Sequence, residues 1–394
     1  MIKKIFLWLH RWLGLVTGIV VIIVSITGCI NVFADELKEY FYHDRYFNQS
    51  VPQPAERLNF SMLLNNAQQA LGKKYKLSRC EVYPAANRNW VFRASKTDPK
   101  GFGHWNYYKY YYRVYVNPYT GKVVSIEDTK NEFFQLMLSL HLNLLLGDQV
   151  GKPITGISVA CFFVILVSGL IIWWPKRLTI KGFKGKLQIK RNAGPKRLNY
   201  DVHNAFGFYT LIPALIITMT GLVFAFDWAD NAVKFIADGG QTVKKRTIPK
   251  SSPAKAYKTI AIDSAIKTLL RKHDTADVFA IRLRDKPTDP FNIQVRLAAN
   301  RTHEFEWYYF DRNTGLQLLH YSNADVKGGE KTRSLNYDLH TGAYAGLPTK
   351  ILAFLASLVC ASLPVTGFMI WYNKRQKKHK KTPIRRRSPA MVGA

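Results

Sequence analysis

The run WLGLVTGIVVIIVSITGCINVFA, Trp12–Ala34, contains no charged residue and decides the fold class. Three more charge-free runs of at least 21 residues follow, at Ile154–Trp174, Ala205–Phe226 and Ile351–Tyr372. A helix needs about 20 apolar residues to cross a bilayer core. Tryptophans and basic residues flank these runs, which is typical of membrane interfaces and disfavours four buried helices of a soluble protein. The sequence therefore predicts four transmembrane helices.

The charge of the chain is strongly positive, with 57 Lys+Arg against 26 Asp+Glu in 394 residues. Basic residues gather before the first run (Lys3, Lys4 and Arg11), in Lys176–Arg197 and in Lys374–Arg387. If the four helices alternate in direction, all three segments lie on one side, and excess Lys/Arg marks the cytoplasm. We therefore expect both termini inside. The excess charge then reports topology and anionic-lipid contact, and no nucleic-acid partner is expected.

The first and third apolar runs share landmarks at equal spacing. His10-Arg-Trp-Leu-Gly14 opens the first run, and Thr17 and Thr27-Gly28 follow. His203-Asn-Ala-Phe-Gly207 opens the third, and Thr210 and Thr220-Gly221 follow at the same offsets from the histidine. This match predicts a tandem repeat.

The second and fourth runs also match, at their basic ends. Ser168-Gly-Leu-Ile-Ile-Trp173 aligns with Thr366-Gly-Phe-Met-Ile-Trp371. Upstream lie His141, 28 residues before Gly169, and His340, 27 residues before Gly367. Each half of the chain thus carries one histidine at each membrane boundary.

The two regions between the helices of each half are expected to fold as small α+β domains. Tyr115–Gly121 and Tyr309–Gly315 each follow a strand-like run, and Asn or Asp opening a tight turn that glycine closes indicates a hairpin. Helix-like segments precede them, at Phe60–Leu71 and Ala261–Lys272. The predicted fold is a membrane α+β protein with four transmembrane helices in two tandem repeats and two α+β domains outside. The expected boundaries are 1–34, 35–135, 136–175, 176–200, 201–226, 227–335, 336–373 and 374–394.

The ordered set of motifs HRWLGL, VNPYTGKVV, LHLNLLLG, SGLIIWWPKR, DVHNAFGFY and DLHTG resembles the PepSY-associated transmembrane family. The resemblance extends from about Lys3 to Arg375. It implies a bacterial inner-membrane protein with two periplasmic PepSY-like domains. Similar members include ferric-siderophore reductases that carry haem b within the helices.

The four boundary histidines are the candidate cofactor ligands, because ionisable groups at membrane depth are costly and are usually functional. Haem iron accepts axial imidazole nitrogen, and two histidine ligands suit electron transfer. A bilayer core of roughly 30 Å separates the two boundaries, so one haem cannot use both levels. We therefore predict two haems, with His10 and His203 on the cytoplasmic side and His141 and His340 on the periplasmic side.

Neighbouring residues have alternative roles. Gly14 and Gly207 lie four residues after a histidine, where they would admit a flat macrocycle or allow close helix packing. Asp201 and Asp338 would orient a histidine ring or cap a helix. Arg11 would pair with a haem propionate or act as a topology signal. The other six histidines are interpreted as ordinary surface or core residues.

The predicted function is reduction of a periplasmic ferric chelate, most simply a ferric siderophore, by electrons from a cytoplasmic donor or quinol. Fe(II) is the softer ion, so reduction weakens a hard-oxygen chelator's hold. A non-catalytic membrane anchor whose PepSY-like domains bind or regulate a periplasmic partner such as a peptidase is the alternative. A pure anchor needs no matched boundary histidines. A transporter is a third class, disfavoured by the few intramembrane polar groups.

Overall fold

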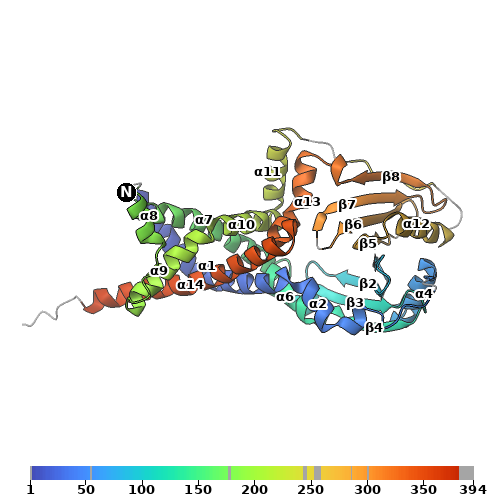
Figure 1. Ribbon diagram of the computed structural model, residues 1–394, viewed down its shortest axis with the longest axis horizontal. Helices are drawn as coiled ribbons and strands as arrows, with labels where there is room; N and C mark the ends of the chain where they lie inside the picture. The colour runs from blue at the N-terminus through green and yellow to red at the C-terminus, as the bar shows by residue number, and fades with distance from the viewer. Residues whose placement is uncertain are drawn as a thin grey trace, which may run out of the picture.

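The computed structural model describes residues 2–53, 56–175, 179–242, 246–252, 259–284, 286–299 and 301–380. The molecule is elongated, with a helical bundle at one end and a β-sheet at the other (Figure 1). Lys176 and Arg177 of the predicted basic loop, and residues 381–394 of the predicted basic tail, lie outside the described residues.

Three helices of the bundle are long and apolar enough to cross a membrane: α1 (Ile2–Val32), α7 (Gly151–Trp173) and α14 (Leu347–Lys380). Helices α9 (Pro195–Tyr209) and α10 (Leu211–Ala225) pass the same test together and make a fourth span if the pair is counted as one. By length and composition, the chain is a multi-pass membrane protein.

The third predicted helix, placed over 201–226, is not a straight helix in the structure. It is bent by 64° between α9 and α10, at Thr210. Pro213 lies three residues beyond the break. Its ring cannot donate a hydrogen bond to the carbonyl of Tyr209 and clashes with it, which is sufficient to break a helix there. The prediction of one continuous helix was wrong because it counted apolar residues and ignored this proline.

Shorter helices connect the bundle to the sheet or lie beside them. They are α2 (Ala34–Phe41), α3 (His43–Tyr46), α4 (Phe60–Leu71), α5 (His104–Tyr107), α6 (Phe133–Asn143), α8 (Ile180–Leu187), α11 (Asp227–Ala237), α12 (Thr259–Lys272) and α13 (Gly328–Thr341). Three short 3-10 turns complete the set, at Thr129–Asn131, Asn323–Asp325 and Ala343–Ala345.

All eight strands belong to one antiparallel sheet in the order β4-β3-β2-β1-β5-β6-β7-β8. The strands are β1 (Arg79–Val82), β2 (Trp90–Thr97), β3 (Tyr108–Val116), β4 (Val123–Asp128), β5 (Val278–Arg282), β6 (Phe291–Ala298), β7 (Arg301–Phe310) and β8 (Gln317–Ser322). The first four come from the first half of the chain and the last four from the second. The order is symmetric about the β1–β5 pair, at which the two halves meet.

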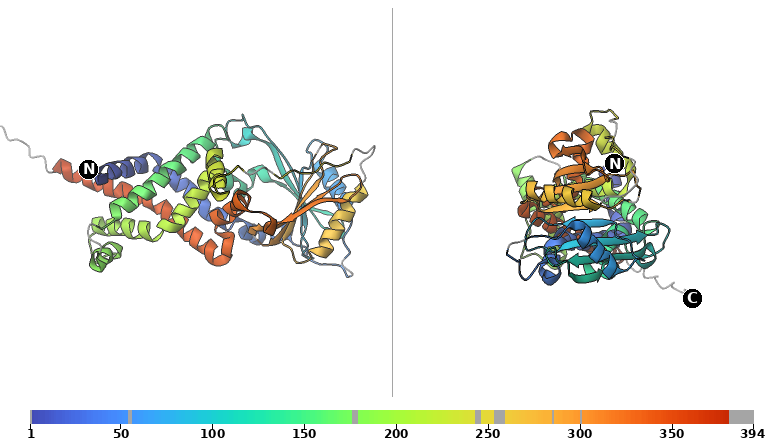
Figure 2. Two further views of the ribbon diagram at one scale, coloured as in Figure 1. Left: turned by 90° about the horizontal axis from the view of Figure 1, so that it is seen from above. Right: turned by 90° about the vertical axis from the view of Figure 1, so that its right-hand side faces the viewer.

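The two predicted α+β regions therefore share one sheet instead of standing apart. A single core cluster joins both halves and includes Phe92 and Phe279. Helices α4 and α12 pack together over it, where the backbone N–H of Ser61 donates to Asp263 at 2.7 Å. Two four-stranded sheets would each expose an unpaired edge, and pairing β1 with β5 satisfies both edges. Figure 2 shows the shared sheet and its helices from two further sides.

Both predicted hairpin turns are confirmed. Asn117 Oδ1 accepts backbone hydrogen bonds at 2.9 and 3.1 Å, and Gly121 closes the turn at φ 71°. Asp311 and Gly315, with φ 75°, repeat this geometry between β7 and β8. The predicted helix over Phe60–Leu71 is confirmed at both ends.

Candidate cofactor-binding sites

The bundle brings His10 and His203 together at the end farther from the sheet. His10 lies on α1 and His203 on α9, and their ring centres are 6.3 Å apart with ring planes at 89°. Both residues are partly exposed. We call them the distal pair.

A second pair lies at the end of the bundle next to the sheet. His141 on α6 and His340 on α13 have ring centres 6.0 Å apart and ring planes at 69°. Both rings are half-buried. We call them the sheet-side pair. The structure thus joins the four histidines in the two combinations that the sequence predicts.

The separation between the two pairs follows from their positions along helix α1. It carries His10, and its Gly28 lies against the ring of His141. These positions are 18 residues apart. At about 1.5 Å per residue, the two levels are separated by about 27 Å along the helix. The pairs therefore lie near opposite ends of one membrane-length helix.

In the distal pair, the Nδ1 atom of each ring is held by a neighbouring helix. His10 Nδ1 donates to the carbonyl of Ile165 at 3.0 Å and lies 3.2 Å from the hydroxyl of Ser168, both on α7. His203 Nδ1 lies 2.8 Å from the Thr366 hydroxyl on α14, and that hydroxyl donates to two carbonyls of its own helix. With its one proton directed to its own helix, the Thr366 oxygen can accept from His203 Nδ1.

The sheet-side pair repeats this arrangement. His141 Nδ1 donates to the carbonyl of Val24 at 2.9 Å and lies 3.2 Å from the Thr27 hydroxyl. His340 Nδ1 lies 3.1 Å from the carbonyl of Ile217 and 2.9 Å from the Thr220 hydroxyl.

The Nδ1 atoms of His10, His141 and His340 contact a carbonyl, which can only accept, so each carries the proton and the lone pair lies on Nε2. The Thr366 hydroxyl can accept from His203 Nδ1 in the same tautomer. No hydrogen bond reaches these Nε2 atoms from the part of the chain that the structure describes. A ring fixed in this tautomer by its far nitrogen is the usual state of a metal-ligating histidine.

One glycine lies against each ring, directly after the serine or threonine that contacts Nδ1. A Cβ added to Gly169, Gly367, Gly28 or Gly221 would stand 3.2–3.4 Å from Cε1 of His10, His203, His141 or His340, respectively. Contacts this short force the neighbour to move. Each of the four Ser/Thr-Gly pairs that mark the repeats in the sequence therefore contacts one histidine ring.

Gly14 and Gly207 behave differently. A Cβ at Gly14 would meet nothing within 4 Å among the described residues, and one at Gly207 would meet only Leu363 Cδ2 at 3.8 Å. Neither glycine is required by a close helix crossing, so the helix-packing alternative was wrong for both. Their contact with a cofactor stays a prediction. Arg11 lies over the ring of Trp12, 5.3 Å from its centre.

Sequence reasoning overlooked two asparagines. Asn199 Nδ2 donates to the carbonyl of Thr366 at 3.0 Å, and Asn336 Nδ2 donates to the carbonyl of Thr220 at 3.2 Å. Each asparagine lies four residues before a paired histidine, on the same face of its helix. Asn199 therefore contacts α14, as His203 does, and Asn336 contacts α10, as His340 does. The signal was present, because Leu-Asn-Tyr-Asp precedes both His203 and His340.

The aspartates of that repeated motif neither orient a paired histidine ring nor cap a helix, the two roles predicted for them. Asp201 pairs with Arg197 at 2.9 Å. Asp338 accepts from Thr302 and from the backbone and ring of His303, at the start of β7. Both aspartates lie inside a helix, so neither is an N-cap, and neither orients a paired ring. His303, interpreted as an ordinary residue, instead ties the sheet to α13.

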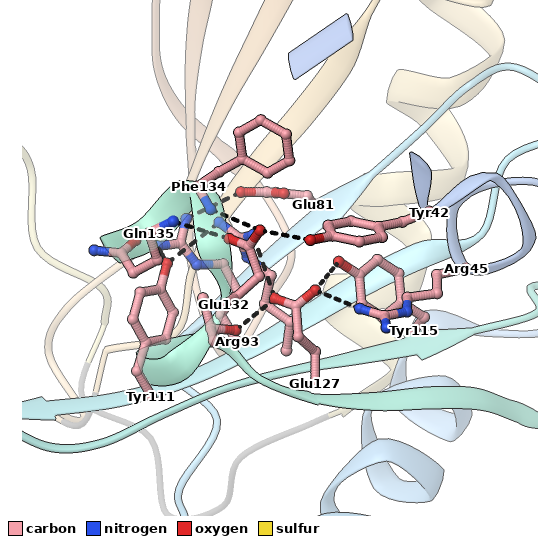
Figure 3. A network of polar contacts seen from close by, with 12 residues as sticks. Tyr42, Arg45, Glu81, Arg93, Tyr111, Tyr115, Glu127, Glu132, Phe134 and Gln135 are labelled. Carbon is pink, nitrogen blue, oxygen red and sulfur yellow. Dashed lines mark hydrogen bonds and ion pairs between the residues drawn. The ribbon is translucent and has the colours of Figure 1, made fainter. Parts of the chain in front are cut away.

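The sheet-side pair is also anchored through α6. Glu132 caps this helix, accepting from the backbone N–H groups of Phe134 and Gln135 at 2.9 Å, and Tyr42 donates to it at 3.0 Å (Figure 3). Burial, with Glu132 nearby, raises the pKa of Tyr42 to about 12, so the phenol stays a donor. The N-terminus of the helix that carries His141 is therefore fixed to the sheet region.

Each pair supplies two imidazole rings as possible ligands. The described residues contain no cluster of three or more His, Cys, Asp or Glu side chains suited to a metal ion. A bare ion therefore lacks ligands, whereas a macrocycle brings its own equatorial donors and needs only two axial ones. A metal about 2.0–2.1 Å from one nitrogen of each ring holds the ring centres about 6.3–6.5 Å apart. The 6.3 Å of the distal pair matches this spacing, and the 6.0 Å of the sheet-side pair is slightly shorter. Both pairs are thus spaced closely enough to hold one metal between their rings.

Comparison with known proteins identifies the family. The family model described as the PepSY-associated TM region matches residues 7–374, nearly the whole chain. No curated protein matches the chain.

Proposed function

The chain belongs to the PepSY-associated transmembrane family, and from this premise we propose that it is a di-haem electron-transfer protein of the bacterial inner membrane. In this proposal it reduces periplasmic ferric chelates, such as a ferric siderophore, with electrons from a cytoplasmic donor or quinol. The sheet region is periplasmic, both termini are cytoplasmic, and the two halves of the sheet are the PepSY-like domains.

The observation that carries the proposal is the shared state of four histidines. Each Nδ1 is bound by a neighbouring helix, each Nε2 is left without a described hydrogen bond, and the rings are paired. Each pair takes one ring from the first half of the chain and one from the second. Haem b, when bound, supplies a one-electron carrier at each level.

The protein contributes fixed geometry at both levels. The carbonyl and hydroxyl that contact Nδ1 hold the tautomer that presents Nε2, and hydrogen bonds to the far nitrogen raise the basicity of a ligating imidazole. The four glycines let each ring lie close to a helix backbone.

Absorption spectroscopy of the full-length protein from haem-replete cells tests the proposal. We expect two haems b per chain, low-spin after dithionite reduction and extractable with acid-acetone. In inside-out vesicles, a ferric chelate trapped in the lumen should be reduced when donor is added outside. A protein without haem would overturn the redox proposal and favour the membrane-anchored binding module.

A further inference from the structure

The sheet carries a row of arginines across the seam between its two halves. The registers β3–β2, β2–β1 and β1–β5 place directly opposite one another Arg113, Arg93, Arg79 and Arg282. Adjacent strands are only about 4.8 Å apart, and like charges directly opposite each other destabilise a sheet. These side chains lie on the face opposite α4 and α12, because the alternating core residues Phe92, Cys80 and Ile281 point to those helices.

Only one end of this row is neutralised. Arg113 lies 3.6 Å from Glu127, and Arg93 lies 3.1 Å from Glu81. Burial would raise the pKa of the Glu81 carboxyl, but the arginines around it, Arg93 first, lower it to about 2, so it stays charged. Figure 3 shows both carboxylates among the arginines and tyrosines of this region.

At the seam end of the row no such ion pair forms within the part of the chain that the structure describes. Arg79 and Arg282 make no ion pair with any residue that the structure describes, and the Nε of Arg79 is buried without a hydrogen-bond partner there. Burial lowers the pKa of Arg79, and Arg93 and Arg282 oppose its charge further although Glu81 supports it. Two guanidinium groups thus lie side by side at the seam, and the described groups that favour their charge include Glu81 and the ring of Trp307, 5.8 Å from Arg282.

A groove opens at this place. It has a volume of about 620 Å³, and besides Arg79, Arg93 and Arg282 its basic lining includes Arg284 and Lys286. Asp289 is the one carboxylate among the described residues of that lining. The volume is within the range of small-molecule sites. Guanidinium groups bind carboxylate, phosphate or catecholate oxygens through paired, charge-assisted hydrogen bonds.

We propose that this seam groove binds the ferric substrate, and that it selects chelates with net negative charge, of the carboxylate or catecholate class, over neutral ones. The proposal rests on the proposed function and adds the substrate's charge class and its docking site. Two halves of the chain each contribute to the site, so it is complete only because β1 pairs with β5.

Binding of redox-inert gallium chelates to the full-length protein in nanodiscs tests this without any reduction step. The probes are gallium tris-catecholate, an anion, and a neutral gallium trihydroxamate of similar size. We expect the anion to bind more tightly, with an affinity that falls as salt is added. The double variant Arg79→Gln/Arg282→Gln should weaken anion binding about tenfold or more and leave the neutral probe unchanged.

Arg271→Gln is the matched control, because it removes one exposed positive charge from α12 on the other face. It should leave both affinities unchanged. Thermal unfolding supplies a check on folding: relieving the repulsion should keep or raise the Tm of the double variant. Equal anion binding by wild type and double variant would overturn the groove as the site, and so would equal preference for the two probes.

The two proposals fail in distinguishable ways. Arginine-dependent binding of the gallium anion without ferric reduction would retain the groove and remove the redox function. Ferric reduction with arginine-independent binding would retain the redox function and remove the groove.

Discussion

The distal and sheet-side pairs have the same ring geometry but are held in place by different parts of the molecule. His10 lies on α1 and His203 on α9, and their Nδ1 atoms contact α7 and α14, which are also helices of the bundle. His141 and His340 lie on the short helices α6 and α13, and both helices are tied to the sheet region, through Glu132 and Asp338. The position of the sheet-side pair therefore depends on a folded domain outside the bundle.

The two short helices that carry the sheet-side pair end differently. Beyond His141, Leu144 and Leu145 adopt φ of 54° and 60°, a conformation that costs a non-glycine residue about 1–2 kcal/mol. Beyond His340, the same turn is made by Gly342 at φ 75°. Local strain next to an assigned site is a sign that the surrounding structure fixes it. The end of the helix that carries His141 is thus fixed by the structure around it.

The largest expected effect separates the pairs directly. His141→Ala or His340→Ala should lower the content from two haems to one, and the remaining haem should still be reduced by the cytoplasmic donor. His10→Ala or His203→Ala should also leave one haem, which dithionite reduces and the physiological donor does not. Haem content and donor-dependent reduction in vesicles measure both. All four should lose ferric reduction, since about 27 Å separates the levels along α1.

The opposite outcome is specific. If His10→Ala and His141→Ala abolished the same spectral signal, the pairing described above would be wrong, and so would the assignment of two levels.

A second test replaces glycines that lie against the histidine rings. Gly169→Val should displace only His10 and Gly28→Val only His141, because each new Cβ would lie 3.2–3.3 Å from the ring. We expect most of the haem at the affected level to be lost, with the other level intact, by difference spectroscopy. Gly185→Ala on α8, where a Cβ meets nothing within 4 Å, is the control and should change neither.

Gly14→Leu tests the predicted role of Gly14 in the same assay. A Cβ at Gly14 meets nothing within 4 Å among the described residues, so we expect the Tm of the haem-free protein to stay unchanged. Normal haem content in this variant would contradict the prediction that a macrocycle lies over Gly14.

A third, smaller effect distinguishes the two aspartates of the repeated motif. Asp338→Ala removes a fully buried acceptor of several hydrogen bonds and should lower the free energy of unfolding by about 3 kcal/mol. We expect the redox potential of the sheet-side haem alone to shift. Asp201→Ala removes a buried carboxylate that pairs with the half-exposed Arg197 and accepts from the backbone N–H of Lys190, and should cost less, about 1 kcal/mol. Denaturant unfolding and redox titration measure these effects. Equal shifts at both levels would contradict the asymmetry.

The smallest effect concerns the cap of α6. Glu132→Ala should cost about 1 kcal/mol and slightly broaden the sheet-side signal only. Thr179→Ala removes the exposed cap of α8, where Thr179 accepts one hydrogen bond from the N–H of Gly182, and should leave both haem signals unchanged. Equal broadening by the two variants would show that α6 is not a specific support for His141.

The sequence by itself determined the features that follow from counting and spacing. Apolar length defines α1, α7 and α14, turn chemistry defines both hairpins, and equal offsets identify the four histidines and their pairs. These signals are local, or repeat at a fixed period, so no contact between distant residues is needed to detect them. The bend at Thr210 was also within reach, since Pro213 encodes it.

Only the tertiary structure decided which neighbours serve those histidines. The Leu-Asn-Tyr-Asp motif is the same before His203 and His340, yet Asp201 pairs with Arg197 whereas Asp338 binds the start of β7. The β1–β5 pairing likewise cannot be derived from either half alone, because an edge strand presents the same unpaired groups to any partner. Spacing along the chain fixes which face a residue occupies, and packing between remote elements fixes what that face meets.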